Sequence, residues 1–216
     1  MVEIIRGTGE QVGAVSTPGI EENTSLAVEL RPWVVAPQPS EADVEELRRQ
    51  RMACGWGADR IPIWEQEIRN GTRYIWFVHA REPSGRTEIA GMISLDLFNS
   101  SDPSLANFRA PGSLAGDRVE VCLAYVYPKF RRRGFWELMV QAAEDTAAEL
   151  GAKIATGNTM SLHPKVRMYE KRGCQRYKPP EKIYDLKEME ALGFGEEHCY
   201  AAFFEKRIYP PRQYRL

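Results

Sequence analysis

A basic turn lies between an apolar segment and a helix-like segment in the second half of the 216-residue chain. It runs from Lys129 through Arg131, Arg132 and Arg133 to Gly134. The first turn of a helix has unpaired backbone N–H groups and a partial positive charge, and Arg side chains add charge-assisted donors. We therefore expect this turn to bind phosphate oxygens, with a diphosphate as its ligand. A solvated surface turn is the alternative interpretation.

The turn lacks two common nucleotide-binding patterns. It has neither the Gly-x-x-x-x-Gly-Lys-Ser/Thr pattern of P-loops nor the Gly-x-Gly-x-x-Gly fingerprint of dinucleotide-binding folds, so nucleoside triphosphates and NAD are not expected. A further interpretation treats residues 129–133 as a nuclear-localisation or nucleic-acid-binding patch. The net charge of -1 disfavours that interpretation because nucleic-acid binders usually carry a basic excess.

Two segments resemble motifs of the GNAT acetyltransferases. Residues 121–140 resemble the family's cofactor-binding motif, in which Arg/Gln-x-x-Gly-x-Gly/Ala follows a strand; their sequence is VCLAYVYPKFRRRGFWELMV. MYEKRGCQRY, residues 168–177, resembles the family's Leu-Tyr-Glu-Lys-x-Gly-Phe block. Two motifs in the family's order and at a similar separation identify the family more specifically than either motif alone. The resemblance extends over residues 26–207.

The resemblance implies a site for coenzyme A (CoA), with acetyl-CoA as co-substrate and no metal. The residues implied to hold the diphosphate, through backbone amides or side chains, are Arg131, Arg132, Arg133, Gly134 and Phe135. The residues implied to pair with the pantetheine arm, which would lie along the strand edge like an added strand, are Leu123, Ala124 and Val126.

The sequence departs from the family pattern at three of these positions. Trp136 stands where the family has a small residue, so the indole must turn outward if the helix is to approach the diphosphate closely. Asn158 corresponds to the family's cofactor-side asparagine only with an insertion, because Leu162 occupies the strict spacing. Cys174 replaces the common Phe.

Two residues are candidates for acid–base catalysis of acyl transfer to an amine. Glu120 matches the glutamate base of one branch of the family, and its apolar neighbours in the sequence would raise its pKa toward a useful value. Tyr169 corresponds to the tyrosine that protonates the departing thiolate in many relatives. The backbone N–H of Val126 or of a neighbour is the implied oxyanion donor. Asp96 is a further polar residue expected to face the acceptor pocket, and His163 is one expected near the thioester end of the cofactor.

The resemblance implies an N-acetyltransferase that acylates a primary amine of a small molecule or peptide by direct attack in a ternary complex. The alternative is a catalytically silent CoA-binding protein with a regulatory or structural role, which Trp136 and the displaced Asn158 leave open.

The elements that must position these residues follow from the hydrophobic pattern. Residues 118–127 have the apolar content of a buried strand, and residues 135–150 have apolar residues at helical spacing before Gly151. Other predicted strands are 26–35, 73–80, 88–98, 153–156, 174–177 and 199–207, and other predicted helices are 40–54, 61–69, 163–171 and 184–192. The pattern indicates an α/β protein. The resemblance implies a GNAT fold, with a mixed central sheet of about six or seven strands, about four flanking helices and a splayed central strand pair.

The length predicts one domain. Residues 1–25 lack a sustained hydrophobic period and are expected to form a flexible N-terminal tail, which leaves 26–216 as a single domain. The acceptor pocket is expected between the helices of residues 41–69, a long loop at 99–117 and an insertion at 179–198 that begins at two prolines.

The composition limits the class of protein. With 43% hydrophobic and 27% charged residues, the chain has the profile of a globular domain. Its four cysteines form no Cys-x-x-Cys pair, and no signal peptide or long apolar run is evident. We therefore expect a cytoplasmic protein without nucleic-acid or membrane partners, whose partner is its amine substrate; a homodimer is compatible with this expectation.

Overall fold

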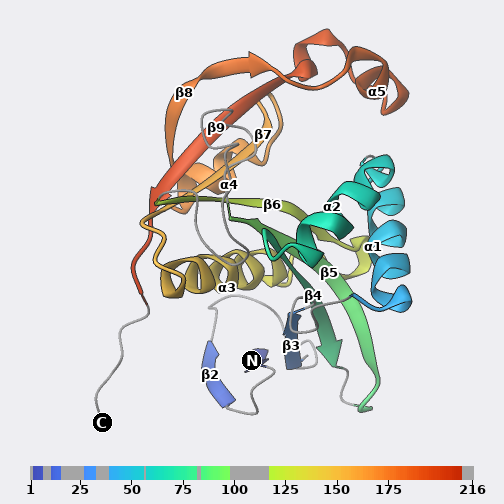
Figure 1. Ribbon diagram of the computed structural model, residues 1–216, viewed down its shortest axis with the longest axis vertical. Coiled ribbons are helices and arrows are strands. Elements are labelled where there is room, and N and C mark those ends of the chain that lie inside the picture. The colour runs from blue at the N-terminus through green and yellow to red at the C-terminus, as the bar shows by residue number, and fades with distance from the viewer. Residues whose placement is uncertain are drawn as a thin grey trace.

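In the described part of the chain, nine strands form one mixed sheet (Figure 1), in the order β2-β1-β3-β4-β5-β6-β7-β9-β8. The computed structural model describes residues 39–55, 57–81, 84–97 and 117–210, together with the backbone of three N-terminal strands. The strands are β1 (Val2–Arg6), β2 (Gln11–Val15), β3 (Ala27–Pro32), β4 (Arg73–Arg81), β5 (Thr87–Asp96), β6 (Arg118–Val126), β7 (Ile154–Met160), β8 (Gln175–Lys182) and β9 (Tyr200–Arg207). Only the β1–β3 and β6–β7 pairs of this sheet are parallel. The predicted mixed α/β sheet is confirmed: β4 to β9 supply six strands, and β1 to β3 extend it.

Helices cover both faces of the sheet (Figure 1). They are α1 (Glu41–Cys54), α2 (Ile61–Arg69), α3 (Phe135–Glu149), α4 (Val166–Lys171) and α5 (Leu186–Ala191), with short 3-10 turns at Ala58–Arg60, Pro128–Phe130 and Glu196–Cys199. One core layer packs α3 against β5 and β6, through Met139 and Ala143 among others. A second layer packs α1 and α2 against the opposite face, around Leu47, Trp64 and Tyr125.

Local sequence explains where α1 begins and ends. Ser40 Oγ accepts a hydrogen bond from the Asp43 N–H at 3.2 Å, and Asp43 Oδ2 accepts one from the Ser40 N–H at 3.1 Å. This capping box satisfies two donors that the helix cannot. Gly55 ends the helix at a φ of 96°, a conformation that glycine adopts without steric cost. The predicted helix start is confirmed.

The N-terminal segment and the segment after α4 differ from the sequence predictions. Strands β1 and β2 fall within residues 1–25, where a tail was expected, and the flexibility of that segment stays a prediction. Strand β8 runs through Pro179 and Pro180 to Lys182, so the prediction that these prolines end the strand is wrong. Proline is tolerated because β8 lies at the edge of the sheet, and the register with β9 shifts around these residues. The predicted acceptor loop at 99–117 lies outside the described residues, apart from Asp117.

The central strands β6 and β7 diverge. They pair at only three positions, Arg118–Ile154, Val119–Ala155 and Glu120–Thr156. Beyond Glu120, β6 continues along β5 while β7 continues along β9. The predicted splay is therefore confirmed, and it opens immediately after Glu120.

A bulge shapes β6 just beyond the opening. Met92 faces Tyr125 and Ser94 faces Cys122, so two residues of β6, Leu123 and Ala124, stand opposite one residue of β5. Leu123 has a φ of 53°, the left-handed conformation that is uncommon outside glycine. Such bulges turn a strand and redirect its side chains.

The bulge brings the two backbones close at Gly91 of β5. A Cβ at this position would lie 2.2 Å from the carbonyl oxygen of Tyr125. We expect Gly91→Ala to lower the free energy of unfolding by about 3 kcal/mol, because backbone must move to admit the methyl group. Gly85→Ala is the control: nothing lies within 4 Å of its Cβ, so only the cost of its left-handed backbone, about 1 kcal/mol, is expected. Urea denaturation measures both changes, and equal losses would contradict the close approach.

Candidate functional site

A buried carboxylate stands where the central strands separate. Glu120 is 2% exposed, and its Oε1 accepts a hydrogen bond from Asn158 Nδ2 at 2.7 Å. The Asn158 Oδ1 accepts a second hydrogen bond from the Tyr184 hydroxyl at 3.0 Å. Burial, followed by the nearby charge of Glu120, raises the pKa of Tyr184, so its phenol remains a donor at neutral pH. The three side chains form a continuous chain of hydrogen bonds across the opening.

Tyr169 reaches the same asparagine from α4. Its hydroxyl donates to the Asn158 carbonyl oxygen at 3.3 Å. Its ring stacks on Phe204, with centroids 4.8 Å apart, and Gly157 leaves room for it, since a Cβ there would lie 3.2 Å from the ring. Burial raises the pKa of Tyr169, which keeps the phenol protonated. The splay thus brings the two predicted acid–base residues, Glu120 and Tyr169, to opposite sides of one residue.

A second carboxylate lies beside Glu120 but is already paired. Asp96 faces Glu120 across the β5–β6 ladder and accepts a hydrogen bond from the buried Arg73 at 2.7 Å. Arg73 also donates to Glu67 at 2.6 Å, and its guanidinium lies 3.2 Å from the sulfur of Cys122. Burial raises the pKa of Cys122 to about 12, so this thiol stays protonated. Asp96 therefore forms an ion pair with Arg73, whereas Glu120 accepts its hydrogen bond from the neutral amide of Asn158.

The basic turn has the geometry of an anion site. Arg132 and Gly134 have φ values of 62° and 80°, and no side chain caps α3. The first bond between this turn and the helix runs from the Leu138 N–H to the Gly134 carbonyl at 3.2 Å. The N–H groups of residues 135–137 consequently have no helical acceptor, and nothing lies within 4 Å of a Cβ built at Gly134. Phosphate oxygens could approach these amides closely.

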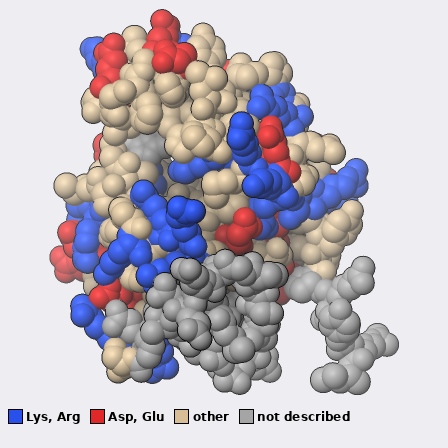
Figure 2. All heavy atoms as spheres, turned by 180° about the vertical axis from the view of Figure 1, so that it is seen from behind, with Lys and Arg blue, Asp and Glu red and all other residues tan. Residues whose placement is uncertain are grey.

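Arginine side chains surround this turn unequally. Arg131, Arg132 and Arg133 are all exposed. Arg131 also donates from Nε to the Val126 carbonyl at 3.1 Å, and its guanidinium stacks over Tyr125 at 6.0 Å, on the α1–α2 side. Figure 2 shows that Lys and Arg gather in patches with Asp and Glu beside them, so a chain of net charge -1 still has local basic regions.

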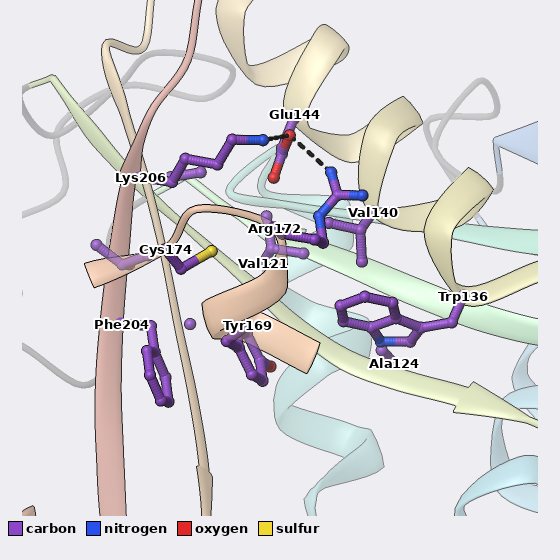
Figure 3. A pocket seen from close by; sticks show the side chains of 13 residues that line it. Val121, Ala124, Trp136, Val140, Glu144, Tyr169, Arg172, Cys174, Phe204 and Lys206 are labelled. Atoms are coloured by element: carbon purple, nitrogen blue, oxygen red, sulfur yellow. Dashed lines mark hydrogen bonds and ion pairs between the residues drawn. The ribbon is translucent and has the colours of Figure 1, made fainter. Parts of the chain in front are cut away.

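A narrow pocket continues the opening on the α3 side (Figure 3). It has a volume of ≈ 30 Å³ and is bordered by Val121, Ala124, Gly157, Tyr169 and Cys174, among others. At its rim, Glu144 of α3 pairs with Lys206 at 2.7 Å and with Arg172 at 2.9 Å. This ion pair network joins α3 to α4 and β9.

Trp136 forms one wall of this pocket. Its indole points toward α4, where it meets the Tyr169 ring edge to face at 6.0 Å and lies under the Arg172 guanidinium at 5.7 Å (Figure 3). The indole therefore lines the slot between the strands. The turn itself fits a diphosphate, whereas the slot must widen before it can accept a pantetheine arm.

The residues predicted to bind the cofactor lie in three places: the start of α3, the unpaired part of β6, and Asn158 of β7. Gly134 and Phe135 form the start of α3, and the segment Leu123–Val126 lies on the part of β6 that β7 does not pair. Asn158 lies between Glu120 and the two tyrosines. Its contact with a cofactor stays a prediction.

Sequence reasoning missed Tyr184 and Arg73. Tyr184 lies in the insertion that was expected to shape the acceptor pocket, but no motif marks it. Arg73 begins an apolar strand, and its pairing with Asp96 depends on the β4–β5 register. His163 lies before α4, and its Nδ1 accepts a hydrogen bond from the Lys165 N–H at 3.0 Å.

The described residues contain neither a metal-ligand cluster nor a helix that could span a membrane. Within the described ranges, no group of three or more His, Cys, Asp or Glu side chains could hold a metal ion. None of the helices in the described part of the chain is long and apolar enough to cross a bilayer.

Comparisons with known proteins place this geometry in a family. The sequence matches the model of the acetyltransferase (GNAT) family over residues 41–174. No curated protein matches the sequence. Similar solved structures include Arabidopsis thaliana NAA60 in complex with acetyl-CoA, with a TM-score of 0.59 and 14% identity over 84% of this chain and 98% of that one.

Two bacterial structures are similar to the same extent. The spermidine/spermine N-acetyltransferase SpeG of Vibrio cholerae has a TM-score of 0.57 and 12% identity, covering 83% of this chain and 93% of its own. The ribosomal-protein-S18-alanine N-acetyltransferase of Escherichia coli has a TM-score of 0.56 and 10% identity, covering 88% and 99%. At these identities the likeness shows the fold alone.

The position of Trp136 yields a test of CoA binding. If the indole occupies space that the pantetheine arm needs, Trp136→Ala should tighten CoA binding by about 10-fold, or 1.4 kcal/mol. Leu138→Ala is the control, because Leu138 lies on the same helix but does not line the pocket. Isothermal titration calorimetry measures both dissociation constants, and weaker binding by the Trp136 variant would show that the indole supports the ligand instead.

Proposed function

The chain belongs to the acetyltransferase (GNAT) family, and on that premise we propose that it transfers an acetyl group from acetyl-CoA to a primary amine. The acceptor would be a small molecule or a peptide, and the amine would attack the thioester directly in a ternary complex. The observation that carries this proposal is the placement of Glu120 and Tyr169 on either side of Asn158, at the point where β6 and β7 separate.

The chemistry requires a proton acceptor for the amine. An alkyl ammonium has a pKa near 10 and is almost fully protonated at neutral pH. Glu120 would take up the proton that the ammonium loses, directly or through a water molecule. Asn158 and Tyr184 would fix the orientation of the Glu120 carboxylate, since Asn158 donates to it and accepts from the Tyr184 hydroxyl.

The departing thiolate requires a proton donor. Formation of the N–C bond breaks the C–S bond, and Tyr169 would give its phenolic proton to the sulfur. The basic turn would bind the diphosphate, and the unpaired edge of β6 around Leu123 and Val126 would align the pantetheine arm beside the bulge.

The two acid–base roles predict losses in kcat. We expect Glu120→Gln and Tyr169→Phe each to lower kcat by about 100-fold with little change in the dissociation constant of CoA, because each removes a proton transfer while keeping nearly the same side-chain size and shape. Matched controls are Glu149→Gln and Tyr209→Phe, since both residues are exposed and remote from the splay. The assay follows free thiol release with acetyl-CoA and a panel of amines.

The raised pKa of Tyr169 predicts a pH dependence. A phenol with a raised pKa keeps its proton to a higher pH than an ordinary tyrosine, whose pKa is about 10. Tyr169 should therefore stay protonated between pH 7 and about 10, and loss of its proton should not lower the kcat of the wild-type protein in this range. A decline in this range that Tyr169→Phe abolishes would contradict the assignment.

Tyr184 predicts a smaller effect. Because Tyr184→Phe removes a hydrogen bond to Asn158 but leaves Glu120 in place, kcat should fall by about 10-fold, roughly one net hydrogen bond of 1–1.5 kcal/mol. A positioning role also requires the pH profile of kcat to shift, whereas a packing role would leave that profile unchanged. The measurement is kcat against pH for both proteins.

Trp136 favours one alternative, a silent CoA-binding protein. An indole in the slot is compatible with a protein that binds CoA for regulation or assembly without turnover. In that case CoA would bind and stabilise the fold, while Glu120→Gln and Tyr169→Phe would change no measurable activity. Silence across the whole amine panel, with CoA bound, would favour this alternative.

A further inference from the structure

A buried arginine on the α1–α2 side of the sheet has no anionic partner. Arg51 of α1 is 4% exposed, and its guanidinium lies over the Trp64 ring at 5.7 Å. Its Nε is buried without a hydrogen-bond partner, and within the described ranges no carboxylate forms an ion pair with it. A buried unpaired charge is costly, so proteins normally supply an opposite charge or leave a place for one.

Two more cations converge on the same place. Arg131 stacks over the ring of Tyr125, which belongs to the same core layer as Trp64, the ring that Arg51 covers. Lys165, just before α4, has a pKa lowered by burial and by the charges of Arg131 and Arg51. No carboxylate in the described part of the chain forms a salt bridge with any of the three, whereas Lys129 nearby pairs with Glu88. Three like charges gathered in this way repel one another unless an anion lies between them.

The location of this cation cluster (Arg51, Arg131 and Lys165) assigns it to the acceptor. Trp64 and Tyr125 belong to the core layer of α1 and α2, the face on which Arg73 and Cys122 also meet. The narrow slot and its indole lie on the other face, against α3. The diphosphate of CoA already has the free amides at the start of α3 and the exposed Arg132 and Arg133. Arg131, which was expected to hold the diphosphate as well, instead contacts Val126 and Tyr125 and is left for the acceptor.

We propose that Arg51, with Arg131 and Lys165, binds an anionic group of the acceptor, so that the acceptor is a small amine that also carries a carboxylate or a phosphate. This inference rests on the proposed acetyl transfer and narrows its substrate class. The amine would lie toward Glu120, and the anionic group would lie toward the α1 end of the opening.

Equilibrium binding tests the anion site without turnover. The probes are a series of ω-amino acids and aminoalkyl phosphates, compared with the matching carboxamides and amino alcohols, titrated into the CoA-saturated protein by calorimetry. We expect the anionic compounds to bind and Arg51→Met to weaken them at least tenfold, while the neutral compounds are unaffected. The two anionic series distinguish a carboxylate from a phosphate.

Two further variants complete the experiment. Arg60→Met removes the same charge from an exposed position of the α1–α2 connection and should change nothing. Lys165→Met should also weaken binding of the anionic compounds, and this variant serves as the test if Arg51→Met does not fold. Equal binding of neutral and anionic compounds, or unchanged anion binding in both variants, would overturn the proposal. A tenfold loss of CoA affinity in Arg51→Met would also overturn it, because the anion would then belong to CoA.

Acetyl transfer separates this inference from the proposed function. If neutral amines are acetylated as well as anionic ones and Arg51→Met leaves their KM values unchanged, acetyl transfer stands and the anion site fails. If anionic amines bind through Arg51 but none is acetylated, the anion site stands and acetyl transfer fails. The expected result is a KM for the anionic amines that rises at least tenfold in Arg51→Met.

Discussion

The three-residue pairing of β6 with β7 is the constraint on which the site depends. A longer ladder would place β7 against β6 beyond Glu120, and the backbone groups of the bulge would then be satisfied within the sheet. Because the strands part instead, β7 carries Asn158 away toward β9, and its side chain bridges the opening to Glu120. The opening, the unpaired edge and the acid–base pair are therefore consequences of one short ladder.

Charged groups are buried on the α1–α2 side at considerable cost, and their pairing is uneven. Arg73 is satisfied by Asp96 and Glu67, which makes its pair a structural unit that joins α2 to β5. Arg51 lies in the same layer without such a partner. This contrast distinguishes a charge that stabilises the fold from one that remains available to a ligand.

The sequence predicts the elements whose signals are local and leaves open what depends on pairing between strands. Ser40 and Gly55 mark the ends of α1 through their own backbone chemistry, and the apolar spacing of residues 135–150 is sufficient to locate α3. The pairing of Arg73 with Asp96 depends on strand register, so no local pattern predicts it. Tyr184 likewise joins the site from a segment distant in sequence, as Arg51 does in the proposed anion site. The site residues that were predicted, Glu120 and Tyr169, were found through resemblance to family motifs, and their catalytic roles remain predictions.

Strand β8 has a consequence for how this protein can associate. An exposed sheet edge offers a row of free N–H and C=O groups to any extended chain, and this is a common route to aggregation. In β8, Pro179 and Pro180 have no N–H to offer, and Lys178, Glu181 and Lys182 add charges along the same edge. Continuation of the sheet into a neighbouring molecule through β8 is thereby blocked, so a second copy would have to associate through another surface.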